Sequence, residues 1–258
     1  MNEIVKIHND LTNEKLSKLS AKGLDLFIAI CYKLKDKGTN KIVIPFSELR
    51  SLASYKTKNS NAEIEKDLND IIDTMFFVLH MKQGNKTKHT VLFESFETDT
   101  DNKTIEIEVK SEYAYIFTDI ASNFTLFELK EFVNLSSKYS KKLYKLLKQF
   151  RSTGLYVSSK EQIYIDLGVP EKYTNANFNT RALNVSLNEC SKCFKNLNCE
   201  PLKSGRGGAV HGYKFTFEPE RPEKEPKKKG KPKSNKFNDF DNKQNYNFDD
   251  LERKLLSN

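Results

Sequence analysis

The sequence has few of the residues that build disulfide frameworks or metal sites. Its 258 residues include only four cysteines, Cys31, Cys190, Cys193 and Cys199. They are too few and too clustered for a disulfide framework in a chain of this size, which agrees with a reducing compartment. Cys190, Cys193, Cys199 and His211 would suit a Cys3His zinc site, but Cys190 falls on the predicted buried face of a helix, where cysteine more often packs as a hydrophobic residue. We therefore expect no metal and no other cofactor.

Long apolar runs and catalytic motifs are absent as well. No run approaches the roughly 20 apolar residues that cross a bilayer, and the start, MNEIVKIHND, lacks a signal peptide's charged and apolar segments. We expect a cytoplasmic protein that does not contact membranes. No G-x-x-x-x-G-K-[ST] phosphate loop occurs, and the four histidines form no His-x-His pair of the kind that a rolling-circle nickase needs beside its tyrosine. The chain is therefore not expected to be an enzyme.

Positive charge, in contrast, is in excess. The chain has 43 Lys and Arg against 35 Asp and Glu, a net charge of +8. This balance favours a polyanionic partner, most often nucleic acid, although many basic proteins merely carry solvated lysines. The charge gathers in LSSKYSKKLYKLLKQFRSTG, residues 135–154, which has six cationic side chains and no acidic one. Its apolar residues recur at helical spacing, so this stretch is predicted to be an amphipathic helix with a basic rim.

The residues before this helix follow the order of a winged helix. Apolar residues at helical spacing predict helices over residues 20–38, 47–55 and 61–79. Strand-like runs follow around residues 76–81, 90–96 and 104–109, and the turn signals Gly84-Asn85 and Asp101-Asn102 separate them. Three helices and a hairpin in this order predict one winged-helix domain.

The same order of elements starts again at Leu135. LSSK repeats the LSAK at residues 19–22, and Gly154 ends the new helix as Gly38 ended the earlier one. A shift of 115 positions superposes apolar residues of the two halves, for example Leu68 on Leu183. Two strand runs around residues 205–208 close the second copy. Arg206 at this hairpin tip suits a wing that enters a minor groove, unless the segment is an ordinary glycine turn.

One segment resembles a known family. NFTLFELKEFVNLSSKYSKKLYKLLKQFRSTG, followed by IYIDLGVPEKYTNANFNTRALNVSLNEC, resembles the iteron-binding replication initiators of small theta-replicating plasmids of the Gram-positive type, and the likeness extends over about residues 1–218. It implies an α+β fold of two tandem winged-helix domains. The first, 1–123, would serve dimerisation and auxiliary DNA contact. The second, 124–218, would read the direct repeats of the origin. The implied partners are double-stranded DNA and a second copy, as a homodimer in equilibrium with the monomer.

Two sets of residues in the second domain are candidates for DNA contact. The first set lies on the basic helix and would contact phosphates, because no carboxylate pairs with its lysines along the helix. The alternative is that these lysines are simply the solvated face of the helix. A recognition helix over about residues 177–195 would offer the other set to base edges, unless the asparagines serve only as helix caps. The phosphate set is Lys138, Ser140, Lys141, Lys142 and Lys145, with Arg206 in the wing, and the base set is Asn177, Asn179, Arg181, Asn184 and Asn188.

The equivalent helix of the first domain is acidic. It carries Glu63, Glu65, Asp67 and Asp70, which would resist entry into a groove. We therefore expect weaker DNA contact and a larger share of protein contacts in the first domain.

The last part of the chain, 219–258, has a different composition. Residues 220–236 hold eight Lys or Arg, three Glu, three Pro and no aliphatic or aromatic residue, which predicts a disordered basic linker. A short apolar motif follows and would dock on a host replication protein or on the chain itself. Its candidate contact residues are Phe237, Phe240, Tyr246, Phe248, Leu251 and Leu255.

Two functions fit these observations. The first is a plasmid replication initiator that binds origin repeats and promotes origin opening and helicase recruitment, with repression of its own promoter as an additional option. The second is a winged-helix transcriptional regulator, or a non-catalytic interaction scaffold with the same fold. The residues do not separate an initiator from a repressor, since these two need the same groove contacts.

Overall fold

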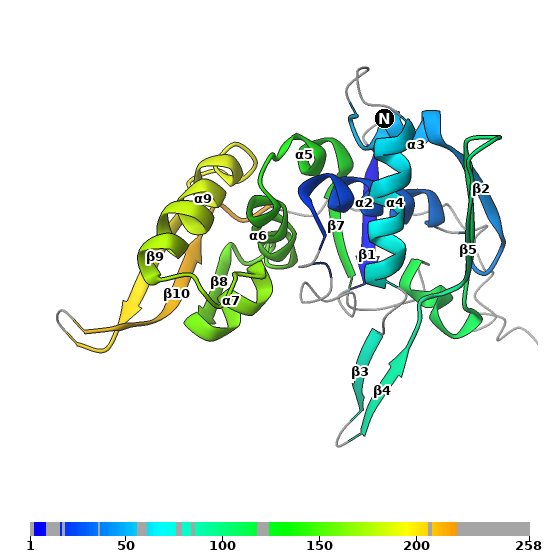
Figure 1. Ribbon diagram of the computed structural model, residues 1–258. Coiled ribbons are helices and arrows are strands. Elements are labelled where there is room, and N and C mark those ends of the chain that lie inside the picture. The colour runs from blue at the N-terminus through cyan, green and yellow to red at the C-terminus, as the bar shows by residue number, and fades with distance from the viewer. Residues whose placement is uncertain are drawn as a thin grey trace, which may run out of the picture. The chain divides into compact units, whose positions relative to one another are not determined.

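A computed structural model describes residues 3–8, 16, 19–35, 37–55, 61–75, 79–83, 86–117, 124–205 and 208–220 (Figure 1). These residues belong to one unit of the chain, Met1–Arg221. Of the predicted tail, 219–258, only residues 219 and 220 are described, and the wing residue Arg206 lies outside the described residues. No described helix is long and apolar enough to cross a membrane.

The first half contains the helices and strands of one winged helix. The Ser20 hydroxyl accepts a hydrogen bond from the backbone N–H of Gly23 at 2.9 Å and so caps the first long helix, α2. Helices α3 and α4 pack against α2. The elements are β1 (Ile4–His8), α2 (Ala21–Leu34), β2 (Ile42–Pro45), α3 (Phe46–Leu52), α4 (Asn61–Met75), β3 (Leu79–Gln83), β4 (Lys86–Thr90), β5 (Phe93–Asp99), β6 (Thr104–Val109) and the 3-10 helix η1 (Ser111–Phe117).

The strands of this half form a three-stranded antiparallel sheet in the order β2-β6-β5 and a separate β3-β4 hairpin. Alternate residues of β6, Ile105, Ile107 and Val109, are buried, as expected for a sheet with one face on the core. Strand β2 was not predicted from the sequence. Strand β1 lies apart from this sheet and pairs with a strand of the second half, β7 (Phe124–Glu128), from Ile4↔Glu128 to His8↔Phe124. The first five residues of the predicted second domain thus pair with the start of the chain, and the boundary at residue 123 stays a prediction.

The second half repeats the winged-helix order. A helix, a strand, two further helical segments and a final pair of strands follow one another, and in the sheet β10 lies between β8 and β9. The predicted α+β fold with two winged-helix domains is thereby confirmed. The elements are α5 (Leu129–Asn134), α6 (Lys138–Gln149), β8 (Leu155–Ser159), α7 (Lys160–Leu167), α8 (Asn175–Phe178), the π-helical turn η2 (Asn179–Leu183), α9 (Asn184–Cys190), β9 (Asn198–Lys203) and β10 (Val210–Thr216).

Gly154 ends the turn that follows α6, at a point where only glycine fits. Its φ is +64°, and a Cβ built on it would lie 2.3 Å from the carbonyl oxygen of Phe217. Gly154 is also hydrogen-bonded to Phe217: the Phe217 backbone N–H donates to the Gly154 carbonyl oxygen at 2.9 Å. Gly38, which follows α2 in the first winged helix, has a similar φ of +63°, but nothing lies within 4 Å of its Cβ position.

These two glycines give a matched test of the fold. Gly38→Ala should cost only the left-handed backbone conformation, about 1 kcal/mol. Gly154→Ala adds a clash with backbone atoms that cannot move without breaking the Phe217 pairing, so we expect at least about twice that loss in the free energy of unfolding. Urea denaturation of both variants measures the difference, and equal midpoints would show that the contact at Gly154 is not a constraint.

Candidate nucleic-acid interface

The predicted recognition helix is one continuous helical run from α8 through η2 to α9, residues 175–190, somewhat shorter than the predicted 177–195. Its inner side is formed by Phe178, Ala182, Leu183, Ser186 and Cys190, all buried. The π-helical turn lies in the middle of the run, and the Thr180 hydroxyl donates to the Ala176 carbonyl at 2.9 Å there. Such turns are found mostly as single-turn insertions in α-helices, often at functional sites.

The outer side of this helix carries most of the predicted base-reading residues. Asn179, Arg181, Asn184 and Asn188 are exposed, and Asn177 is half-buried, with its backbone N–H capped by the Thr174 hydroxyl at 3.2 Å. Thr180, which the sequence reading did not select, is exposed on the same side between Asn179 and Arg181. This surface offers amide, hydroxyl and guanidinium groups, the types that bond base edges in a major groove.

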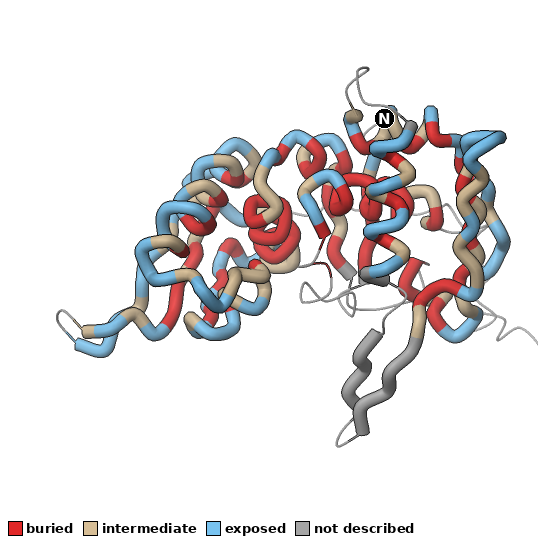
Figure 2. The backbone as a smooth tube through the Cα atoms, in the orientation of Figure 1, coloured by how far each residue is buried: buried red, intermediate tan, exposed pale blue. Residues whose placement is uncertain are grey.

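The predicted phosphate-contacting residues lie elsewhere, and here the structure corrects the sequence reading. Ser140, Lys141, Lys142 and Lys145 are 0%, 1%, 2% and 3% exposed. Of the five residues selected on this helix, only Lys138 keeps part of its side chain at the surface. The four side chains are buried because α6 is covered from several directions: α2, α5 and β7 contact it, and so do α7 and α9. Figure 2 shows α6 as a buried helix at its place in Figure 1.

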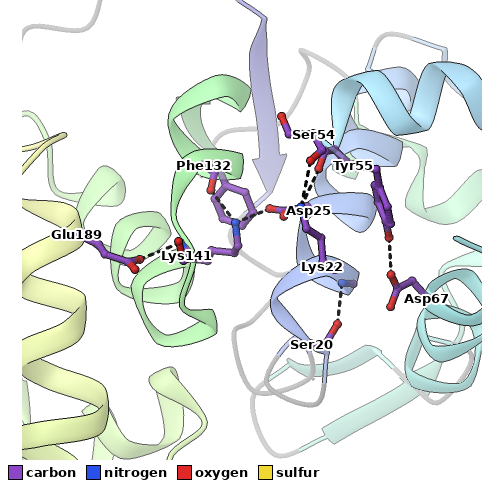
Figure 3. A network of polar contacts seen from close by, with 12 residues as sticks. Ser20, Lys22, Asp25, Ser54, Tyr55, Asp67, Phe132, Lys141 and Glu189 are labelled. Carbon is purple, nitrogen blue, oxygen red and sulfur yellow. Dashed lines mark hydrogen bonds and ion pairs between the residues drawn. The ribbon is translucent and has the colours of Figure 1, made fainter. Parts of the chain in front are cut away.

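Lys141 has a carboxylate partner far away in the sequence. Its Nζ lies 2.5 Å from Asp25 Oδ1 on α2 and 2.9 Å from the Phe132 carbonyl oxygen, and 4.9 Å from the centre of the Phe132 ring (Figure 3). Lys22 also reaches Asp25, at 3.3 Å. Partners along the helix alone do not predict this ion pair. Asp25 in the apolar run LDLFIAI was a signal for it, because a carboxylate in such a run needs a cationic neighbour.

Burial is the main influence on the ionisation of this pair. It raises the pKa of the Asp25 carboxyl to about 6, against the attraction of Lys141 and Lys22. Burial also lowers the pKa of the Lys141 ammonium, against the attraction of Asp25. Burial thus opposes both charges, and the attraction between Lys141 and Asp25 counters it for each of them.

The other buried lysines of α6 also have surroundings inside the protein rather than in solvent. Lys142 donates to the Leu167 carbonyl, at the end of α7, at 2.8 Å. Lys148 lies 3.3 Å from Glu131 and 3.0 Å from Glu220. Burial lowers the pKa of Lys142 to about 7, with a further contribution from nearby Lys138, and burial lowers the pKa of Lys145 to about 8. The basic rim of α6 thus connects secondary-structure elements to one another.

Helix α6 is also attached directly to the recognition helix. Glu189 of α9 accepts hydrogen bonds from the backbone N–H groups of Ser136 and Ser137, at 3.0 and 3.2 Å, at the start of α6. The Cys190 thiol donates to the Ser140 carbonyl oxygen at 3.5 Å. Cys190 is buried, as the sequence predicted, and burial raises its pKa. The end of the recognition helix is therefore held on the first turn of α6.

The equivalent helix of the first winged helix, α4, has the acidic face predicted for it. Glu63 and Asp70 are exposed, and Glu65 and Asp67 are half-buried. Asp67 accepts a hydrogen bond from the Tyr55 hydroxyl at 2.5 Å. This face carries the wrong sign of charge for a DNA groove, whereas residues 175–188 of the second winged helix carry no acidic side chain.

Comparisons with known proteins agree with this architecture. Residues 4–148 match the family model described as "Initiator Replication protein, WH1", and residues 159–217 match "Initiator Rep protein, WH2". The chain is 33% identical over 224 residues to a protein of Bifidobacterium longum named "Probable replication protein rep", covering 86% of this chain and 74% of that protein. The crystal structure of the Pi initiator protein in complex with iteron DNA is similar in fold, with a TM-score of 0.66 and 16% identity over 84% of this chain and 97% of that one.

The lowered pKa of Lys142 predicts how stability depends on pH. Between its pKa of about 7 in the folded protein and about 10.4 in the unfolded chain, the unfolded chain binds more protons. The free energy of unfolding of the wild type should therefore rise with pH across this window, relative to Lys142→Met, by about 2 kcal/mol between pH 7 and 9. Urea unfolding at pH 7, 8 and 9 measures this change.

The matched control is Lys130→Met, which removes an exposed lysine of α5. Its stability should run parallel to that of the wild type over the same pH range. If the Lys142→Met curve also runs parallel to the wild type, the Lys142 ammonium is solvated and its assigned burial is wrong.

Proposed function

The chain belongs to the family of initiator replication proteins with paired winged-helix domains, and we propose that it starts replication by binding repeated sequences in the duplex DNA of its origin. The family assignment agrees with the resemblance seen in the sequence. The Pi initiator, which is similar to this chain in fold, was crystallised in complex with iteron DNA. The same class of ligand, tandem repeats in double-stranded DNA, is what we propose for this chain.

The observation that carries this proposal is the composition of the exposed side of the recognition helix. Arg181, Asn184 and Asn188 are exposed there, and the acidic residues of the helix begin only at Glu189, whose carboxylate is engaged by the backbone of Ser136 and Ser137. Arginine pairs with guanine O6 and N7, and asparagine with adenine N6 and N7. A helix of this kind in a major groove would read sequence, with Asn177 and Asn179 at its entry.

Phosphate contacts in this proposal come from the edge of the interface and not from the interior of α6. Lys138 at the start of α6 and Arg206 in the wing are the candidates that remain from the sequence, and Arg206 lies outside the described residues. Such contacts would fix the register on the duplex without selecting a sequence. The buried Lys141, Lys142 and Lys145 would act indirectly, through the position of α6.

The first winged helix has a different role in this proposal. Its acidic α4 favours protein contacts over a DNA groove, which supports dimerisation as its main function and leaves DNA contact an auxiliary one. Binding without catalysis suits both domains. The apolar motif of residues 237–255, which lies outside the described residues, stays a proposed docking segment for a host replication protein.

Two substitutions separate base reading from phosphate contact. Asn184→Ala should weaken binding to the repeats beside the gene by about 10-fold and leave scrambled duplex unchanged, because one base pairing is lost. Lys138→Met should weaken both duplexes alike and lower the slope of log K against log salt by about 1. Salt-titrated gel shifts measure both effects.

Asn40→Ala, at an exposed asparagine of the first winged helix, is the control and should bind both duplexes as the wild type does. Equal affinity of the wild-type protein for repeats and scrambled duplex at every salt concentration would contradict sequence-specific origin binding.

A further inference from the structure

The recognition helix, residues 175–190, contains a wider turn that matches the spacing of its buried residues. Four of these recur every four positions: Phe178, Ala182, Ser186 and Cys190. An α-helix has 3.6 residues per turn, so each step of four moves about 40° around the axis, and three steps would carry the buried side through about 120°. In the π-helical turn η2 the Asn184 backbone N–H donates to the Asn179 carbonyl oxygen, five residues back. This wider turn offsets part of the drift, which keeps Phe178 and Cys190 in one core.

Thr180 forms a side-chain hydrogen bond across the start of this turn. Its hydroxyl donates to the Ala176 carbonyl oxygen, four residues back, at 2.9 Å, and lies 3.5 Å from the Asn177 carbonyl oxygen. The backbone N–H of Asn179 is shared between the carbonyls of Asn175 and Ala176. A threonine hydroxyl that bonds the carbonyl four residues back competes with the regular backbone bonds and bends the helix. The Thr180 hydroxyl therefore favours the irregular geometry where α8 meets η2.

The turn separates the candidate base-reading asparagines into two groups. The earlier group is Asn177 and Asn179, and the later group is Asn184 and Asn188. The later group is held on the start of α6 by the hydrogen bonds of Glu189 and Cys190. A turn closed by bonds between residues five apart holds more residues than the 3.6 of an α-helix. It therefore rotates the earlier group about the helix axis relative to the later one.

We propose that Thr180 is a positioning residue for base selection, which stabilises the π-helical turn and so sets the direction of the earlier group relative to the later one. This inference rests on the proposed function, since it describes how the DNA-reading surface is arranged. The single hydroxyl proton of Thr180 is donated to the Ala176 carbonyl and is not offered to a base. Loss of the hydroxyl would keep every base-reading side chain and change the angle between the two groups.

Two variants separate the hydroxyl from the shape of the side chain. Thr180→Val removes the hydroxyl and keeps the branched shape, whereas Thr180→Ser keeps the hydroxyl and removes the methyl group. Ser191, which follows α9, provides a matched control, because it is exposed and its hydroxyl donates to the Asn188 carbonyl oxygen at 2.9 Å. Ser191→Ala therefore removes an equivalent hydrogen bond at the other end of the helix, outside η2.

The experiment is a selection of preferred duplexes from a pool with randomised sequence, using the full chain. Asn179→Ala and Asn188→Ala first identify the base-pair positions that depend on each group. Thr180→Val should then lower the preference about 3- to 10-fold at the positions that Asn179→Ala affects, as the loss of one hydrogen bond implies. It should keep the preference at the positions that Asn188→Ala affects. Its salt slope on scrambled duplex should equal that of the wild type, because no phosphate contact is removed.

Three further results are expected. Thr180→Ser and Ser191→Ala should both retain the wild-type preference. The double variant Thr180→Val/Asn179→Ala should lose no more at the Asn179 positions than Asn179→Ala alone, because the two residues act as one unit there.

An unchanged preference for Thr180→Val, an equal loss at every position, or a loss in Thr180→Ser as large as that in Thr180→Val would overturn this inference and leave origin binding intact. A loss confined to positions that neither asparagine variant affects would also overturn it, since Thr180 would then contact a base itself. A wild-type protein that selects no sequence at all would overturn both proposals.

Discussion

The buried ion pair between Lys141 and Asp25 is the constraint on which the second winged helix depends. Every residue of α6 from Tyr139 to Lys148 is buried, and four of them are lysines. A charge in the interior is tolerated only when it is paired or hydrogen-bonded, and removing one partner of a buried pair costs about 3–5 kcal/mol. Helix α6 can therefore be packed in this way only with Asp25 of α2 beside Lys141. Because replacing both members of such a pair by apolar residues is often neutral for stability, we infer that this pair specifies the arrangement of the helices more than it adds net stability.

The position of α6 then determines the position of the DNA-reading surface. Its first turn receives Glu189 and Cys190 from α9, and its buried Tyr139 reaches the turn before α8. The C-terminal end of the recognition helix and the turn before its N-terminal end are thus in contact with α6. Base recognition requires side chains to be held within a fraction of an ångström, which a helix packed on a buried neighbour can provide. In the proposed function the basic rim supports DNA reading through structure, and groups outside the buried part of α6 would contact the DNA.

The sequence predicted those features that depend on local pattern. Helical periodicity located α2, α4 and α6, glycines at 38 and 154 marked the ends of helical regions, and the exposed position of Arg181, Asn184 and Asn188 followed from the apolar residues beside them. Features that depend on distant contacts were not predictable in this way. The pairing of β1 with β7 joins residues more than a hundred positions apart, and Lys141 finds Asp25 across 116 residues. Spacing along one helix reveals only i,i+4 partners. On that basis the lysines were predicted to lack carboxylate partners and to contact phosphates.

The most direct test of this account is the salt dependence of duplex binding by the double variant Asp25→Leu/Lys141→Met. Replacing both members of a buried ion pair by apolar residues is often neutral for stability. If Lys141 acts only inside the fold, the slope of log K against log salt on scrambled duplex will equal that of the wild type. A slope smaller by about 1 would mean that Lys141 neutralises a phosphate, which would contradict its assigned role as an internal connection.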